Sequence, residues 1–153
     1  MEAAVQRAYR EIGGLTPLLA DCGALCEAAC CLPDADGQGG VYLFPGEERL
    51  LPGTDDGFAP LHICEGACDR VSRPLGCRIF PLTPVKSASG WTVRLDRRAR
   101  AMCPLCKSGL KGLDPAFVRA VSRAIRIIAE EPEGEAFLEK WQALEDGFRS
   151  ARL

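Results

Sequence analysis

The chain has 153 residues and a formal net charge of −2, with 47% hydrophobic and 26% charged residues. This composition predicts one folded domain over residues 1–153 with a core of its own, and it excludes a disordered chain. The small net charge gives no general attraction to nucleic acid, and no segment is apolar and long enough to cross a membrane.

Two helices are predicted at the start of the chain. Segment 2–12 places apolar residues on one helical face, and Gly13-Gly14 ends the pattern. Thr16-Pro17 is typical of a helix cap followed by a first-turn proline, so segment 18–31, rich in Ala and Leu, is expected to form a second helix. The first seven residues carry charges of both signs and do not resemble a signal peptide, so we expect a cytoplasmic protein.

The middle of the chain predicts short elements separated by turns. Residues 33–40 indicate an ordinary turn, since they lack the distal glutamate of a calcium loop. Residues 41–44 predict a short strand and 45–51 one helical turn. Ser87 to Gly90 joins two apolar runs and predicts a hairpin, in which Trp91, Val93 and Leu95 alternate toward one face.

The last third of the chain predicts helices. Asp114-Pro115 is a cap and first-turn proline, and Pro132 and Gly134 are expected to break the chain before a final helix. We therefore expect an α+β fold: a small Cys-rich, metal-stabilised domain with short strands and flanking N- and C-terminal helices. Its cysteine core would cover about residues 20–110 and its C-terminal helical part about residues 114–153. Apolar residues predicted to pack in the two last helices are Phe117, Val121, Ile125, Ile128, Phe137, Leu138, Trp141, Leu144 and Phe148.

Nine cysteines dominate the chemistry that this sequence can support. In a reducing compartment they favour metal or redox chemistry over structural disulfides, and the odd number also argues against a purely disulfide framework. The single histidine, His62, excludes a site that needs two histidines. All nine are candidate metal ligands: Cys22, Cys26, Cys30, Cys31, Cys64, Cys68, Cys77, Cys103 and Cys106.

The spacing of these cysteines suggests how they could act together. If segment 18–31 is helical, residues four apart share a face, so Cys22, Cys26 and Cys30 would align while Cys31 points elsewhere. We therefore expect a later cysteine, Cys77 among them, to complete the site. In the C-x2-C pair near residue 105, Cys103 is the expected ligand and Cys106 the spare. Four thiolates serve zinc or a [4Fe–4S] cluster equally well, so the metal stays open.

Charge is unevenly distributed along the chain. Residues 64–107 carry nine basic and three acidic side chains, a net charge of +6, whereas residues 21–56 carry one basic and eight acidic ones, a net charge of −7. The basic segment could therefore face the acidic one, and its arginines could stabilise thiolates. No aromatic residues interleave Arg94 to Arg100, which argues against a nucleic-acid surface.

The stretch Arg73-Pro74-Leu75-Gly76-Cys77-Arg78-Ile79-Phe80-Pro81, together with Cys30-Cys31, resembles the YkgJ-type cysteine-cluster family of zinc- or iron-chelating proteins (CxxCxxCC domain). In this resemblance Cys68 precedes the RPxxCRxFP run, Cys77 lies inside it, and Cys103 is similar to the family's final cysteine. It covers roughly residues 20–110. The resemblance implies metal binding and no particular reaction.

The expected function is therefore a metal-binding cysteine-cluster protein that coordinates zinc or iron, as a [4Fe–4S] centre in the second case. It would act as a carrier, a store or a metal-stabilised module that binds a protein partner. An iron–sulfur redox or enzyme accessory protein and a thiol–disulfide redox protein are the alternatives. No serine–histidine–acid set and no phosphate-binding glycine loop is visible, so the sequence favours a protein without catalysis of its own.

Overall fold

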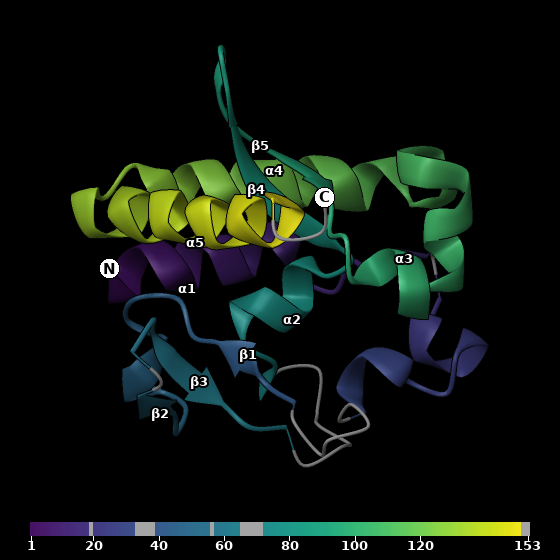
Figure 1. Cartoon of the computed structure of the whole chain (residues 1–153), viewed down its shortest axis with the longest axis horizontal. Helices are drawn as coiled ribbons and strands as arrows, with labels where there is room; N and C mark the ends of the chain where they lie inside the picture. The colour runs from purple at the N-terminus through teal and green to yellow at the C-terminus, as the bar shows by residue number, and fades with distance from the viewer. Residues whose placement is uncertain (19, 33–38, 56, 65–71, 151–153) are drawn as a thin grey trace.

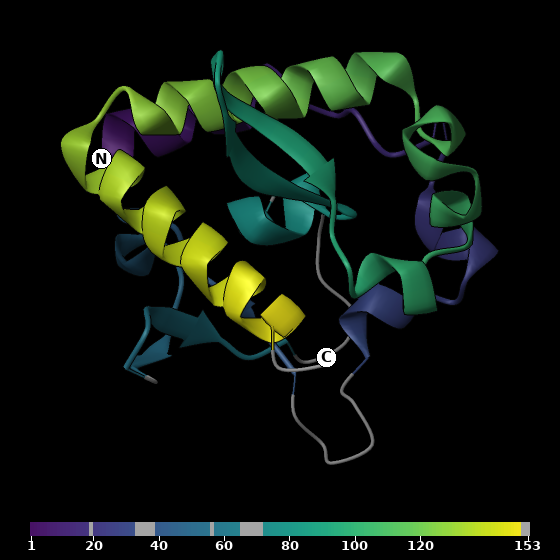
Figure 2. The ribbon, with the colours of Figure 1, turned by 45° about the horizontal axis from the view of Figure 1, so that its top comes forward.

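The three longest helices, α1, α4 and α5, pack together in the fold. A computed structural model describes residues 1–18, 20–32, 39–55, 57–64 and 72–150. Helix α1 packs against α4, and α4 packs in turn against α5 and the hairpin strand β5 (Figures 1 and 2). Their bounds are Glu2–Ile12 for α1, Pro115–Ala129 for α4 and Pro132–Ser150 for α5.

Local signals explain where these helices begin and end. Gly13, at φ 52°, ends α1 and donates its N–H to Tyr9 O, and the carboxylate of Asp114 caps α4 by accepting from Ala116 N at 2.7 Å. Both boundaries are as predicted. The chain break expected at Pro132 and Gly134 lies just before Pro132, which is the first residue of α5. Gly134 lies in the first turn of α5, where a Cβ would run into the carbonyl of Ile128.

Two small antiparallel sheets complete the α+β fold. The predicted hairpin is confirmed as β4 (Leu82–Ser87) and β5 (Gly90–Leu95), with Leu82 opposite Leu95. The second sheet has the strand order β1-β3-β2. The predicted strand at 41–44 is shorter than expected, and the predicted turn at 45–51 is a 3₁₀ turn over Glu47–Arg49. The bounds of that sheet's strands are Val41–Tyr42 (β1), Thr54–Asp55 (β2) and Pro60–His62 (β3).

One cluster of buried side chains reaches from α1 to α5. It includes residues of α1, α4, α5, the hairpin and the short helix α2 (Leu75–Ile79). The stripe predicted on α4 is fully buried, as are Phe137, Leu138 and Trp141 of α5, while Leu144 is half-buried. The side chain of Phe148 lies outside the described residues. None of the described helices has the length and hydropathy needed to span a membrane.

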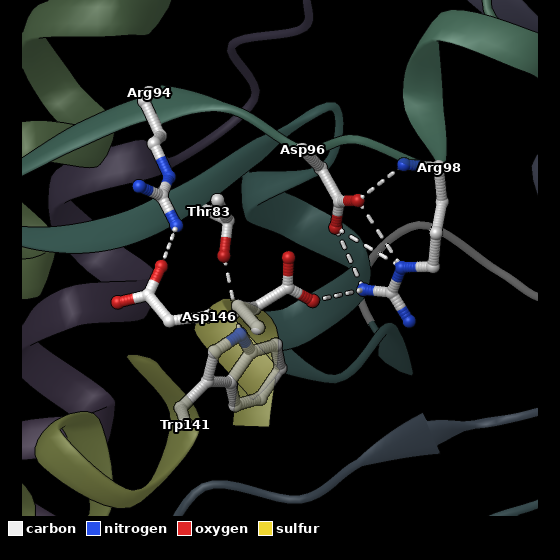
Figure 3. Close-up of polar contacts among 7 residues, drawn as sticks. Thr83, Arg94, Asp96, Arg98, Trp141 and Asp146 are labelled. Atoms are coloured by element: carbon white, nitrogen blue, oxygen red, sulfur yellow. Dashed lines mark hydrogen bonds and ion pairs between the residues drawn. The ribbon is translucent and has the colours of Figure 1, made fainter. Parts of the chain in front are cut away.

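The C-terminal half of α5 is fixed to the hairpin by polar contacts (Figure 3). Trp141 donates its indole N–H to Thr83 Oγ1 at 3.1 Å, and Arg94 pairs with Asp146 at 3.1 Å. Asp96, buried after β5, accepts from both the backbone N–H and the guanidinium of Arg98. These contacts hold the hairpin and the segment that follows it against α5.

The helix predicted over 18–31 is wrong for the described part of that segment. The chain instead forms two 3₁₀ turns, Cys22–Leu25 and Ala29–Cys31. Between them, Glu27 and Ala28 have positive φ values of 52° and 55°. Two consecutive residues in the left-handed region reverse the direction of the chain and are incompatible with an α-helix. The helical alignment expected for Cys22, Cys26 and Cys30 is therefore not formed.

Candidate metal centre

Five cysteines from three separate chain segments line one cavity of about 60 Å³. That volume exceeds what a single water molecule needs. Arg73, Arg78 and several apolar side chains complete its wall, and no described Asp, Glu or His lines it. A donor set of thiols alone suits zinc or an iron–sulfur centre better than a hard cation. The five cysteines are Cys22, Cys26, Cys30, Cys77 and Cys103.

The first three cysteines reach the cavity through turns and not through a helical face. Asp21 begins the first turn by accepting from Gly23 N at 3.1 Å, and the Cys26 thiol contacts Cys22 O at 3.8 Å. The reversal at Glu27 and Ala28 then returns the chain so that Cys30 joins the other two around the cavity. The second 3₁₀ turn lies against α3 (Ala99–Met102), which leads directly into Cys103.

Cys77 enters the cavity from α2, whose position depends on a buried carboxylate. Glu47 is fully buried and accepts hydrogen bonds from Leu75 N and Phe44 N, each at 2.7 Å, and from the Tyr9 hydroxyl. Its pKa is raised by burial, although these hydrogen bonds and the charge of Arg78 oppose the shift. One side chain therefore ties α1, the segment after β1 and the first turn of α2 together.

Arg78 connects this carboxylate with the cavity. Its guanidinium lies 4.2 Å from the centre of the Tyr9 ring, and its Nε donates to Arg73 O at 2.8 Å. Burial and the neighbouring Glu47 hold the pKa of Tyr9 well above its usual range, so Tyr9 stays a neutral donor. The Arg78 guanidinium at the cavity wall thus lies against the Tyr9 ring, and the hydroxyl of Tyr9 is in turn hydrogen-bonded to Glu47.

The first cluster, Cys22, Cys26, Cys30 and Cys31, is crowded, and this affects the protonation of its thiols. The pKa of Cys30 is raised to about 12. The largest cause is desolvation of the Cys30 sulfur, followed by the charge and hydrogen bond of Cys31 and by the charges of Cys22 and Cys26. Four neighbouring thiols cannot all ionise without a compensating cation, because each thiolate disfavours the next. A metal ligand must be a thiolate, so binding a cation here would release protons.

Of the other four candidate cysteines, the three that the structure describes do not line the cavity. Cys31 and Cys64 are half-buried, and Cys106 is buried with 6% of its surface exposed. Cys68 lies outside the described residues. His62 contacts Pro52 O through Nδ1 at 2.7 Å, away from the cavity lining. Cys77 thus shares its cavity with the first cluster, as expected, and of the C-x2-C pair only Cys103 lines it.

The donors of the cavity are spaced differently from what a metal ion needs. Within the described ranges, no three Cys, His, Asp or Glu side chains lie close enough together to hold a metal ion. The cavity thus has the donor chemistry of a thiolate-bound metal site but not yet its spacing. Its sulfurs would have to approach one another to reach Zn–S distances of about 2.3 Å.

For three basic side chains, the expectation that the basic segment faces the acidic segment is wrong. Lys86, Arg94 and Arg98 form ion pairs with α5, because the hairpin that carries the basic residues packs against that helix. Arg78 does face the acidic segment, where its charge acts on Glu47. Sequence reasoning did not identify Glu47 as a buried residue. An acidic residue in an acidic stretch is expected on the surface, and the burial of Glu47 depends on three backbone segments that meet only in the fold.

The motif resemblance has no support from comparison with known proteins. No family model, no curated protein and no solved structure matches the chain. The resemblance to the cysteine-cluster family therefore rests on the RPxxCRxFP run and the Cys30-Cys31 pair alone.

Proposed function

We propose that this chain is a metal-binding protein of the YkgJ-type cysteine-cluster kind, which coordinates zinc or iron through thiolates. The observation that carries the proposal is the cavity lined by Cys22, Cys26, Cys30, Cys77 and Cys103. Free cysteines pack well as single apolar residues, but five thiols from three segments around one cavity are a set of donors rather than ordinary packing. The metal would be held by four of these five.

The wall of the cavity supplies what a thiolate site requires besides sulfur. Arg73 and Arg78 line it, and their positive charge offsets the charge that four thiolates would bring. Ile12, Leu15 and Phe80 add apolar side chains to the same lining. A bound zinc or iron–sulfur centre would supply a cation for these thiolates, and the chain's own part is to gather, shield and neutralise the sulfurs.

Anaerobic purification followed by elemental analysis tests the proposal. We expect bound zinc or iron, with a brown colour that bleaches in air if the centre is iron–sulfur. Cys77→Ser should lower the metal content, whereas the matched control Cys64→Ser should not, because Cys64 lies outside the cavity lining. Freshly isolated protein without metal, or equal loss from both variants, would reject the proposal.

A chelator provides a second test on the unmodified chain. Structural zinc contributes on the order of 10–16 kcal/mol in small domains, as much as a typical fold's whole stability. Removing the metal should therefore increase hydrogen exchange in residues 72–106 more than in α4 and α5. Equal protection with and without chelator would contradict this expectation.

A further inference from the structure

Cys103 and Cys106 occupy the two ends of one hydrogen-bonded turn. Cys106 N donates to Cys103 O at 3.1 Å, at the start of the 3₁₀ segment Pro104–Gly112. Such a turn holds its first and last Cα atoms within about 7 Å, and a disulfide requires about 4.4–6.8 Å. Residues three apart in a 3₁₀ turn also project their side chains to the same side. This backbone turn therefore brings the Cys103 and Cys106 side chains close to each other.

The two sulfurs differ in what they can meet. Cys103 is half-buried and lines the cavity, whereas Cys106 has 6% of its surface exposed and lies outside the lining. A small molecule that reaches this pair therefore meets Cys103 first. Cys106 is close enough to react with Cys103 but is protected from direct attack.

We propose that Cys103 and Cys106 form a thiol–disulfide couple, oxidised by a low-molecular-weight disulfide such as glutathione disulfide, and that closing it withdraws Cys103 from the thiols of the cavity. The effect on metal rests on the proposed function, while the couple itself does not. The C-x2-C pair would thus make metal retention depend on the thiol redox state of the surroundings.

The exchange proceeds in two balanced steps. The Cys103 thiolate attacks one sulfur of the small disulfide, forms a mixed disulfide and releases the other half as a thiolate. The Cys106 thiol then gives its proton to the thiolate released in the first step, and its sulfur attacks the Cys103 sulfur and releases the second half, which takes up from water the proton that Cys103 lost at the start. Two protein thiols are oxidised, and one small disulfide is reduced to two thiols.

Cys30 and Cys31 are the competing pair, and their geometry is less suitable. Cys31 lies close enough to contribute to the raised pKa of the Cys30 thiol. Adjacent residues, however, have Cα atoms only about 3.8 Å apart, shorter than the usual span of a disulfide. The hydrogen-bonded turn that joins Cys103 and Cys106 closes its ends to a span that overlaps the range a disulfide needs.

Disulfide mapping on the full chain tests the couple. The protein is reduced, treated with chelator, exposed to excess glutathione disulfide, alkylated and digested for mass spectrometry. We expect a Cys103–Cys106 disulfide that lacks two hydrogens and carries no glutathione. Cys106→Ser should instead accumulate a stable glutathione adduct on Cys103, and circular dichroism checks that this variant is folded. If the Cys106→Ser variant does not fold, the disulfide map of the wild-type protein alone decides whether the couple forms.

Two results would overturn the proposal. One is a persistent glutathione adduct on wild-type Cys103, or a link from Cys103 to a different cysteine. The other comes from repeating the oxidation on protein as purified: if the Cys103–Cys106 disulfide forms and the metal content stays the same, Cys103 is not withdrawn from the site. Protein that is isolated without metal would reject the proposed function and leave the disulfide map as an independent result.

Discussion

Replacing Glu47 should destabilise the fold far more than its position in an acidic, turn-rich segment suggests. In Glu47→Ala the buried N–H groups of Phe44 and Leu75 lose their acceptor, as does the hydroxyl of Tyr9. A buried donor without a partner costs about 1–3 kcal/mol, so the two backbone groups alone account for about 2–6 kcal/mol. That is a large part of a typical stability of 5–15 kcal/mol.

Urea unfolding measures this loss, with the fluorescence of Trp91 and Trp141 as the signal and linear extrapolation to water. Glu47→Gln should fall between Ala and wild type, because its amide keeps one acceptor oxygen but presents N–H groups to the other donor. Glu48→Ala is the matched control in the same turn: its side chain is exposed and accepts only from Gly46 N, so we expect a loss below about 1 kcal/mol.

The reasoning also predicts where the damage appears. Because Glu47 accepts from the first turn of α2, the loss should increase hydrogen exchange at Leu75 and its neighbours before it affects α4. If Glu47→Ala and Glu48→Ala were equally stable, the buried carboxylate would not be the link between α1 and α2.

Three further predictions concern single positions. Ala28→Gly should stabilise the protein by about 1 kcal/mol, measured as a higher urea midpoint at unchanged slope, because φ 55° strains any residue with a Cβ; no gain would contradict the left-handed turn. Gly76→Ala should cost about 1–3 kcal/mol, since its Cβ would run into the Val41 side chain, whereas Gly147→Ala, with open space around it in α5, should be neutral or stabilising. Burial raises the pKa of Glu145, so its contribution to stability is present below the ordinary value of 4.5 and is lost as pH rises through the folded pKa; Glu145→Gln should therefore gain on wild type as the pH rises above 4.5, and parallel pH profiles would refute this.

The elements that the sequence predicted correctly are those with strong local signals. The first helix, the cap at Asp114 and the hairpin at 87–90 depend on residues within one or two turns of each other. Segment 18–31 failed for the opposite reason. Its Ala and Leu content favours a helix, but the reversal at Glu27 and Ala28 has no sequence signal, because neither residue is one that usually adopts positive φ.

The cysteine cavity was predicted correctly in part, and for a partly wrong reason. A helix was expected to align Cys22, Cys26 and Cys30, yet they line the same cavity through turns. The three cysteines meet although the predicted helix is not formed, because residues this close in sequence lie near one another in almost any compact backbone. Cys77 was expected to join them because Cys31 would point away from the shared helical face, and Cys103 was preferred to Cys106 partly through the motif resemblance; the contacts that place both are long-range and carry no local sequence signal.

The two sides of the cavity are built differently, and this bears on how the sulfurs could come closer together. Cys77 is carried by a helix between fully buried Leu75 and Ile79, and that helix is tied to Glu47. The two 3₁₀ turns that carry the first cluster contain no buried residue. Displacing α2 would break core packing and buried hydrogen bonds, whereas displacing the turns would cost little of either. We infer that a metal would draw the turns toward α2, which serves as the fixed wall of the site.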